Sequence, residues 1–123
     1  MKVATAAEAI VQQQLDAYNA RDVDAWLATY AEDARQFEHP DKLLARGAAQ
    51  LRERISVRFK EPNLHARLIR RIVVGTVVID HEEVTRTFLE GPGKMEMIGI
   101  YDVRDGRIAT ASFVFGPKVL DPR

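Results

Sequence analysis

The sequence predicts an α+β fold in which helices come first and long, mostly antiparallel strands follow. In the first half of the chain, apolar residues recur at helical spacing. In the second half they fill four long segments that turn residues separate, and the Asp105-Gly106 pair between two of these segments is typical of a tight hairpin. Because helices and strands are segregated along the chain, the predicted architecture is a sheet with its helices on one face.

Two helices are predicted at the start of the chain, each with its own capping residue. Thr5 and Glu8 have the spacing of a capping box, and the apolar pattern after them repeats at helical period up to Tyr18. The stretch NARD ends this helix, and Asp22 is suited to cap a second, shorter one. The apolar positions of the second helix are Trp26, Leu27 and Tyr30.

A short strand and a third helix are predicted next. The segment RQFEHP, residues 35–40, predicts a strand that Pro40 ends, because proline has no N–H to give to a ladder. Alternation gives a common face to Arg35, Phe37 and His39. A loop is expected up to Gly47, and a helix over residues 48–59 follows it. The apolar stripe of that helix contains Leu51, Ile55 and Phe59.

Four long strands are predicted in the second half of the chain. They cover residues 64–74, 76–89, 95–103 and 108–116. Three helices cannot cover strands of this length from end to end. A long, twisted sheet is therefore expected to curl around the helices and leave a cavity at its open end.

Composition limits the possible classes of function. A chain of 123 residues is expected to form a single domain, residues 1–123. Lys and Arg number 18, as do Asp and Glu, so the net charge is zero and neither nucleic acid nor an anionic membrane is the expected partner. The absence of cysteine excludes disulfides and thiolate chemistry. No segment has the composition of a signal peptide or a membrane span, so we expect a cytoplasmic protein.

The order of elements, together with three local stretches, resembles a known superfamily. The stretches are LDAYNARDVDAWLATYAEDA leading into a strand that ends at a proline, GAAQLRERI, and YDVRDGRI. From about Ala6 to Phe115 the chain resembles the nuclear transport factor 2-like superfamily, and within it the SnoaL-like and ketosteroid-isomerase-like proteins. The resemblance implies a cone-shaped, cystatin-like α+β barrel with an interior pocket, commonly a homodimer packed through the outer sheet face.

The resemblance also implies positions for catalytic residues. Ketosteroid isomerases carry a general-base aspartate on the strand just before this proline, and His39 stands there. Imidazole titrates near neutral pH, so His39 is a competent base. The tyrosine position of the first helix corresponds to Gln14, with Tyr18 one turn further on, and the protonated-acid position of the penultimate strand corresponds to Ile98. The familiar set of oxyanion donors is therefore incomplete.

A second resemblance within the same fold is to limonene epoxide hydrolases, which use an Asp-Arg-Asp set. The strand that would carry the arginine and one aspartate reads HEEVTRT here. It places Glu83 and Thr85 at those positions, so epoxide hydrolysis by that mechanism is disfavoured.

The family register predicts an apolar ligand pocket with a few polar groups. The strands would contribute Phe37, His81, Glu83, Thr85, Ile98, Ile100, Phe113 and Phe115, and the helices Trp26, Tyr30 and Phe59. Each aromatic residue has a competing explanation as plain core, and the segment DHEE is also typical of an exposed strand. A bulge would reverse the inward set on its strand.

Three functions remain open. The first is an isomerase or lyase in which His39 removes a proton next to a carbonyl and Tyr18 or Gln14 steadies the oxyanion. The second is a non-catalytic module that binds a hydrophobic small molecule, and the third is a homodimeric scaffold. We expect no cofactor and no metal. A metal site of His39, His81 and Glu83 is compatible with ligand chemistry, but no spacing along the sequence supports it.

Overall fold

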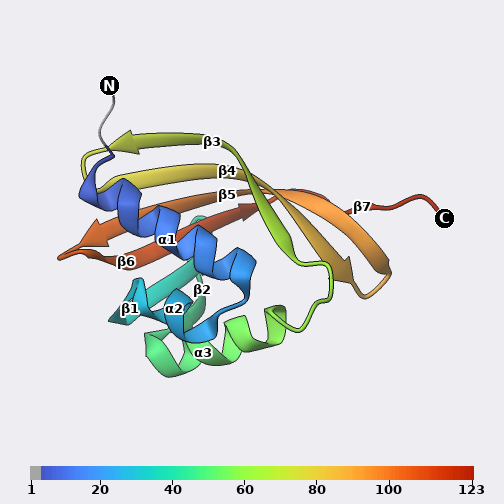
Figure 1. The fold of residues 1–123 in the computed structure, drawn as a ribbon, viewed down its shortest axis with the longest axis horizontal. Coiled ribbons are helices and arrows are strands. Elements are labelled where there is room, and N and C mark those ends of the chain that lie inside the picture. The colour runs from blue at the N-terminus through green and yellow to red at the C-terminus, as the bar shows by residue number, and fades with distance from the viewer. Residues whose placement is uncertain (1–3) are drawn as a thin grey trace.

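The structure, a computed structural model, describes residues 4–123 and contains three helices and a curved sheet (Figure 1). The helices are α1 (Ala6–Ala20), α2 (Val23–Ala28) and α3 (Gly47–Arg58). The strands are β1 (Tyr30–Glu38), β2 (Lys42–Arg46), β3 (His65–Val74), β4 (Val77–Phe88), β5 (Gly91–Arg104), β6 (Arg107–Phe115) and β7 (Val119–Leu120). The predicted α+β class is confirmed.

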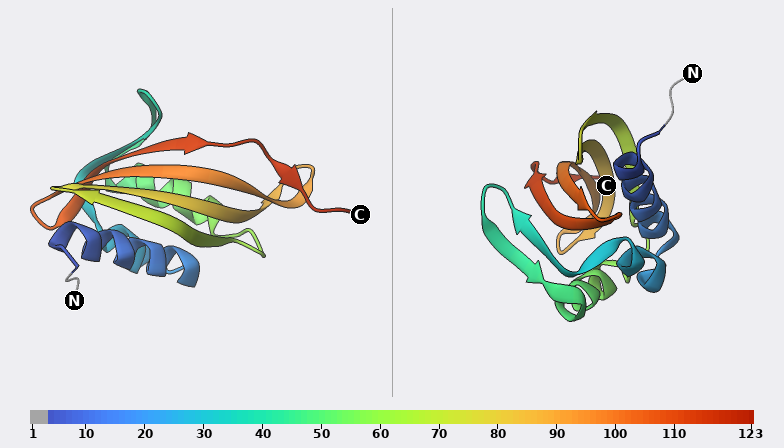
Figure 2. Two further views of the ribbon diagram at one scale, coloured as in Figure 1. Left: turned by 90° about the horizontal axis from the view of Figure 1, so that it is seen from above. Right: turned by 90° about the vertical axis from the view of Figure 1, so that its left-hand side faces the viewer.

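The sheet has the strand order β2-β1-β6-β5-β4-β3, and the short β7 pairs with β5. Every neighbouring pair is antiparallel except β1 and β6, which are parallel. The sheet curves strongly and wraps around the helices (Figure 2). Helix α1 contacts β3 to β6, while α3 contacts β1 and β2. The helices therefore pack against the concave face of the sheet.

Both predicted helix caps at the N-terminal end form. The Thr5 hydroxyl accepts a hydrogen bond from the Glu8 N–H at 3.0 Å, and the Asp22 carboxylate accepts one from the Ala25 N–H at 3.0 Å. Helix α2 is shorter than predicted and does not include Tyr30. That residue begins β1 instead, where it pairs with Ile108 of β6, so pairing in the sheet overrides the helical pattern there.

The stretch after Pro40 is a strand rather than the predicted loop. Residues Lys42–Arg46 form β2, which turns back on β1 and pairs with it at the edge of the sheet. Most of its side chains are exposed. Because ladder hydrogen bonds rather than apolar burial hold this edge strand, the hydrophobic pattern gave no signal for it.

The predicted hairpin at Asp105-Gly106 joins β5 to β6. Asp105 has φ 51° and Gly106 has φ 77°, the left-handed pair that a two-residue hairpin turn requires. The other predicted turn, residues 90–94, is shorter than expected, because β5 already begins at Gly91. The four long strands otherwise match their predicted ranges within a few residues.

The hydrophobic core lies between α1, α3 and the concave face of the sheet. Its most completely buried apolar side chains include Val11, Trp26, Tyr30, Leu51, Val78, Tyr101 and Ile108. None of the helices within residues 4–123 is long and apolar enough to span a bilayer. The aromatic members of this core reach the cavity described next.

Candidate functional site

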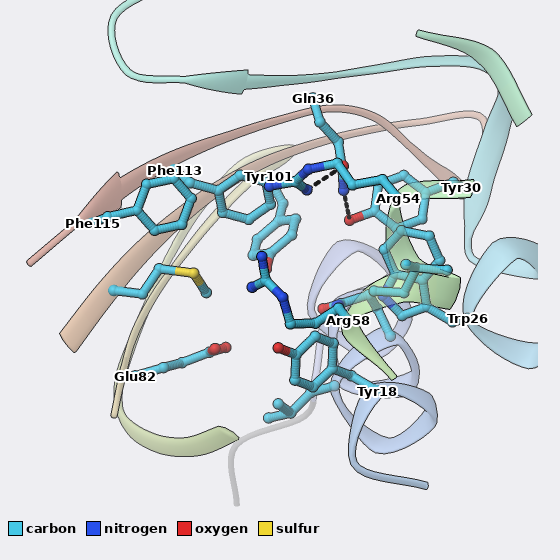
Figure 3. A pocket seen from close by; sticks show the side chains of 14 residues that line it. Tyr18, Trp26, Tyr30, Gln36, Arg54, Arg58, Glu82, Tyr101, Phe113 and Phe115 are labelled. Carbon is cyan, nitrogen blue, oxygen red and sulfur yellow. Dashed lines mark hydrogen bonds between the residues drawn. The ribbon is translucent and has the colours of Figure 1, made fainter. Parts of the chain in front are cut away.

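A cavity opens inside the fold, between the three helices and the concave face of the sheet (Figure 3). It offers about 50 Å³ to the centres of water-sized molecules, which is room for a few waters or a compact organic group. Its lining residues are Gln14, Leu15, Tyr18, Trp26, Tyr30, Gln36, Arg54, Ile55, Arg58, Glu82, Met97, Tyr101, Phe113 and Phe115. The wall is largely aromatic and carries a small number of polar groups, as ligand sites commonly do.

Glu82 is the carboxylic acid of this cavity. The residue is only 3% exposed, and its side chain projects from β4 toward the Tyr18 hydroxyl (Figure 3). Burial raises its pKa to about 8, repulsion from Asp80 adds to the rise, and Arg71 opposes it. Both protonation states of Glu82 are therefore accessible near neutral pH, which suits a general acid or base.

The alternation of β4 explains why Glu82 faces inward. Val78 and Val84 are both buried in the core, and Glu82 lies an even number of residues from each of them. Its partner across the ladder is Met97 of β5, which also lines the cavity. The two apolar residues at the ends of this stretch therefore fix the face on which the acid lies.

A buried ion pair lies beside Glu82 on the same face of β4. Asp80 is fully buried, and the Arg71 guanidinium donates two hydrogen bonds to its carboxylate, at 2.7 and 2.9 Å. Arg71 also donates to the Gln12 amide oxygen at 2.9 Å. The bond to Asp80 raises the pKa of Arg71, so the pair stays charged. Asp80 places a fixed negative charge two residues from Glu82.

The helices contribute polar atoms that lack partners. Among the described residues, the Gln14 side-chain oxygen Oε1 and the Trp26 Nε1–H are buried without a hydrogen bond. Buried polar atoms normally have hydrogen-bond partners, so each of these two atoms is available to a water or a ligand.

Burial raises the pKa of both Tyr18 and Tyr101. Their hydroxyls therefore remain protonated donors at neutral pH.

Two arginines of α3 line the opposite wall. Arg54 donates to the Gln36 amide oxygen at 2.8 Å, and the Gln36 amide N–H donates to the Tyr30 hydroxyl at 3.2 Å (Figure 3). Arg58 is one turn further along the same helix. Burial, and then repulsion from Arg58, lower the pKa of Arg54.

The prediction that His39 projects into the cavity is wrong. His39 lies beyond the end of β1 and is exposed, with its backbone N–H donating to the Phe113 carbonyl at 2.8 Å. The inward residues of β1 are Tyr30, Ala34 and Gln36. Phe37, predicted as a pocket residue, lies on the other face with the Arg35 guanidinium 5.7 Å from its ring centre.

The physical reason is that this part of the cavity wall is polar. Gln36 is buried because Arg54 and Tyr30 satisfy its amide, so the apolar residue of the alternating pattern is not the one that faces inward. Counting from the proline consequently assigns the wrong face to the whole strand.

The predicted inward set on β4 and β5 is also wrong by one residue. His81, Glu83 and Thr85 on β4, and Ile98 and Ile100 on β5, all face away from the cavity. In the ladder His81 pairs with Ile98, and its Nε2 lies 2.9 Å from a Glu96 carboxylate oxygen. The error is shared because residues opposite each other across a ladder lie on the same face.

Six of the predicted site residues do line the cavity: Gln14, Tyr18, Trp26, Tyr30, Phe113 and Phe115. Phe59 does not line it. Its buried ring instead packs edge-on against Tyr18, with 5.5 Å between the ring centres.

Within residues 4–123 there is no cluster of three or more His, Asp or Glu side chains suited to a metal.

Several cavity residues were not predicted from the sequence, namely Gln36, Arg54, Arg58, Glu82, Met97 and Tyr101. A signal for Glu82 existed in its even spacing from Val78 and Val84. A signal for the helical arginines existed in their helical spacing from the buried Leu51, since Arg54 follows it by three residues and Arg58 by seven.

Residues 11–111 match the SnoaL-like domain, which is most of the chain. The chain belongs to the SnoaL-like domain family. The predicted cystatin-like, nuclear transport factor 2-like architecture is confirmed by solved structures of that fold. No match was found between this SnoaL-like protein and curated proteins.

Solved structures with the same fold differ in their described activities. An uncharacterized cystatin fold protein from Novosphingobium aromaticivorans has a TM-score of 0.80 and 22% identity, and the match covers 91% of this chain and 99% of that chain. An LEH-like epoxide hydrolase from M. tuberculosis has a TM-score of 0.77 and 18% identity, covering 89% and 82%. A putative ketosteroid isomerase from Kribbella flavida has a TM-score of 0.75 and 18% identity, covering 96% and 82%.

Proposed function

We propose that this SnoaL-like protein is an isomerase or lyase that moves a proton on a small carbonyl compound, with Glu82 as the acid–base group. One observation carries the proposal: a buried carboxyl with a pKa of about 8 lines a cavity whose wall contains six aromatic side chains. Glu82 therefore takes the role of general base that the sequence analysis gave to His39, because His39 is exposed. Solved structures of this fold described as a putative ketosteroid isomerase, a putative polyketide cyclase and an epoxide hydrolase support an enzymatic role for such a cavity.

The proposed step begins with the carboxylate of Glu82. It takes a proton from a carbon next to the carbonyl, and the electron pair of the broken C–H bond moves into an enolate. If the substrate carries a β,γ C=C bond, the enolate is conjugated with it, and return of the proton from Glu82 to the γ carbon gives an isomer. If the β carbon carries a leaving group, that group departs with the electrons of its bond to carbon and takes the proton from Glu82, which gives the product of a lyase. A base whose pKa lies near the working pH is well matched to both halves of the reaction.

The enolate oxygen needs hydrogen-bond donors. Tyr18 and Tyr101 are protonated phenols in the cavity wall, and the Trp26 Nε1–H is buried without a partner among the described residues. Donors already held in a dry site stabilise a developing oxyanion strongly. The rings of Phe113 and Phe115 line the same space and make it less polar. Gln14 would bind a donor group of the ligand through its free oxygen.

Hydrogen–deuterium exchange at carbon tests this proposal. Acetophenone and 2-oxobutanoate in D₂O are incubated with the protein, and loss of the C–H signal next to the carbonyl is followed by NMR. We expect exchange that Glu82→Gln abolishes and His39→Ala leaves unchanged. Binding without any exchange would contradict the enzymatic proposal and favour a non-catalytic ligand-binding module. Exchange that is lost in His39→Ala and kept in Glu82→Gln would show that His39 is the general base, and would contradict the role proposed for Glu82.

A homodimer through the outer sheet face remains a prediction. The convex face carries exposed apolar side chains on neighbouring strands, including Ile72 of β3, Ile98 of β5 and Val114 of β6. An apolar patch of this kind favours association of two copies. A structural scaffold would need this surface and not the cavity.

A further inference from the structure

Arg54 and Arg58 form a cationic end to the cavity. They lie four residues apart on α3, so they project from the same face of the helix, and both line the cavity (Figure 3). Two cations side by side in a partly desolvated wall repel each other. The lowered pKa of Arg54, which burial and the nearby Arg58 cause, is consistent with that repulsion.

Arg54 has no anionic partner among residues 4–123. Its guanidinium donates to the neutral Gln36 amide at 2.8 Å and lies 6.0 Å from the centre of the Phe113 ring. Buried or half-buried charges are normally paired with an opposite charge. A neutral amide and an aromatic face orient Arg54 toward the cavity and leave its charge uncompensated.

Arg58 is only partly compensated. Its Nε lies 3.3 Å from a Glu61 carboxylate oxygen, but that carboxylate also accepts two hydrogen bonds from Arg86, at 2.9 Å each. The favourable position of a cation in the last turn of a helix accounts for a basic residue at this position. It does not account for a second arginine one turn earlier.

The cavity acid does not neutralise these arginines. Among the described residues Glu82 forms no ion pair with Arg54 or Arg58, and the cation that acts on it is Arg71, behind the cavity wall. The cavity therefore has a carboxyl on its sheet side and two cations on its helix side. A ligand that spans this space meets both.

We propose that Arg54 and Arg58 bind the carboxylate of a small oxo acid, the carbonyl of which lies toward Tyr18, Tyr101 and Glu82. The position given to the carbonyl group rests on the proposed function, whereas the position of the carboxylate does not. Guanidinium groups match carboxylates through paired N–H donors. The limited volume of the cavity favours a compact carboxylic acid over a sterol-sized neutral ketone.

Trp26 supplies a direct readout of binding. It is the single tryptophan of the chain, it is buried, and it lines the cavity. The probes are 2-oxobutanoate, its neutral methyl ester and inorganic phosphate, each titrated against the tryptophan fluorescence of the full chain. We expect the acid to bind roughly ten- to hundredfold more tightly than the ester, the range typical of a hydrogen-bonded ion pair.

Variants assign the difference to the arginines. Arg58→Met and Arg54→Met should each weaken binding of the acid by more than binding of the ester, so that the preference for the acid falls. The matched control is Arg52→Met on the same helix, because Arg52 is exposed and pairs with Asp24 at 2.7 Å outside the cavity. Thermal melting checks that each variant folds. If Arg54→Met does not fold, Arg58→Met carries the test alone.

The outcomes separate this inference from the proposed function. Arginine-dependent binding of the acid supports it even if no C–H exchange occurs. Equal affinity for acid and ester, no binding by any probe at millimolar concentration, or an acid preference that survives Arg58→Met overturns it. Tighter binding of phosphate than of the acid also overturns it. Glu82-dependent exchange of the ester, without preference for the acid, would leave the proposed function standing alone.

Discussion

Arg71 holds the Asp80 carboxylate with two hydrogen bonds, of 2.7 and 2.9 Å, in the core directly beside the cavity acid. The pair is nearly inaccessible to solvent, with 10% of the Arg71 side chain and none of the Asp80 side chain exposed. Because Asp80 lies two residues before Glu82 on the same face of β4, its charge opposes ionisation of Glu82. Arg71 moderates that effect.

Replacing Asp80 by its neutral isostere should lower the pKa of Glu82. Asp80→Asn removes the negative charge that raises this pKa and leaves the positive charge of Arg71 that lowers it. The measurement is the pH profile of C–H exchange, which should shift to lower pH. Breaking a buried pair also costs about 3–5 kcal/mol of stability, so the profile is recorded well below the melting temperature. An upward shift would mean that Asp80 does not act on Glu82 as a charge.

The stability of the protein should fall as pH rises through the neutral range. The pKa of Glu82 is about 8 in the folded state and 4.5 in its unperturbed state, so between these values the folded state binds a proton that the unfolded state has lost. Folding stability then decreases by up to about 1 kcal/mol per pH unit across this window and levels off above it.

Glu82→Gln should remove this slope. Urea unfolding at about pH 5.5, 7 and 9 measures it, and the wild type should lose stability relative to the variant as the pH increases. His81→Gln is the control, because His81 is on the same strand and faces outward. A wild-type profile parallel to that of Glu82→Gln would show that Glu82 ionises normally in the folded protein.

Gly99 shapes the cavity by making room for Tyr101. A Cβ built at Gly99 would lie 2.8 Å from the Tyr101 hydroxyl oxygen and from a ring carbon, closer than such atoms approach each other. Gly99→Ala should therefore displace the ring, at a cost of about 1–3 kcal/mol in stability. We expect weaker ligand binding by tryptophan fluorescence. Gly75→Ala is the control for lost stability alone. Its φ of 58° makes alanine unfavourable there, but the added Cβ would meet no neighbouring atom, and Gly75 does not line the cavity.

Most of the fold could be predicted from the sequence because its signals are local. The capping residues Thr5 and Asp22 and the Asp105-Gly106 turn each act within a few residues, and each forms as expected. The edge strand β2 could not be predicted, because its place depends on pairing with β1 and not on its own hydrophobic pattern.

The site could be predicted only in part because strand faces depend on register. Gln14, Tyr18 and Trp26 on the helices and Phe113 and Phe115 on β6 line the cavity as predicted, whereas Phe59 does not line it, and His39 and Glu83 were assigned to the wrong face. A shift of one residue exchanges the two faces of a strand. The buried amide of Gln36 and the buried carboxyl of Glu82 are polar residues in core positions, which a hydrophobic pattern cannot identify.

The outer sheet face offers a test of the expected homodimer. Ile98→Lys places a charge on the convex face, which also carries the exposed Ile72 and Val114. Residue 98 does not line the cavity, so the cavity is left intact. We expect the wild type to sediment as a dimer and the variant as a monomer at micromolar concentration. A monomeric wild type would end the prediction and leave the cavity arguments unaffected.

The central claim is that Glu82 lies in the cavity as a carboxyl with a strongly raised pKa. Titration of its ¹³C-labelled carboxyl carbon by NMR, with Glu82→Gln to assign the signal, tests this claim most directly. We expect a midpoint at about pH 8. A midpoint near 4.5, the ordinary value for a glutamate, would contradict the claim and remove the basis for acid–base chemistry in this cavity.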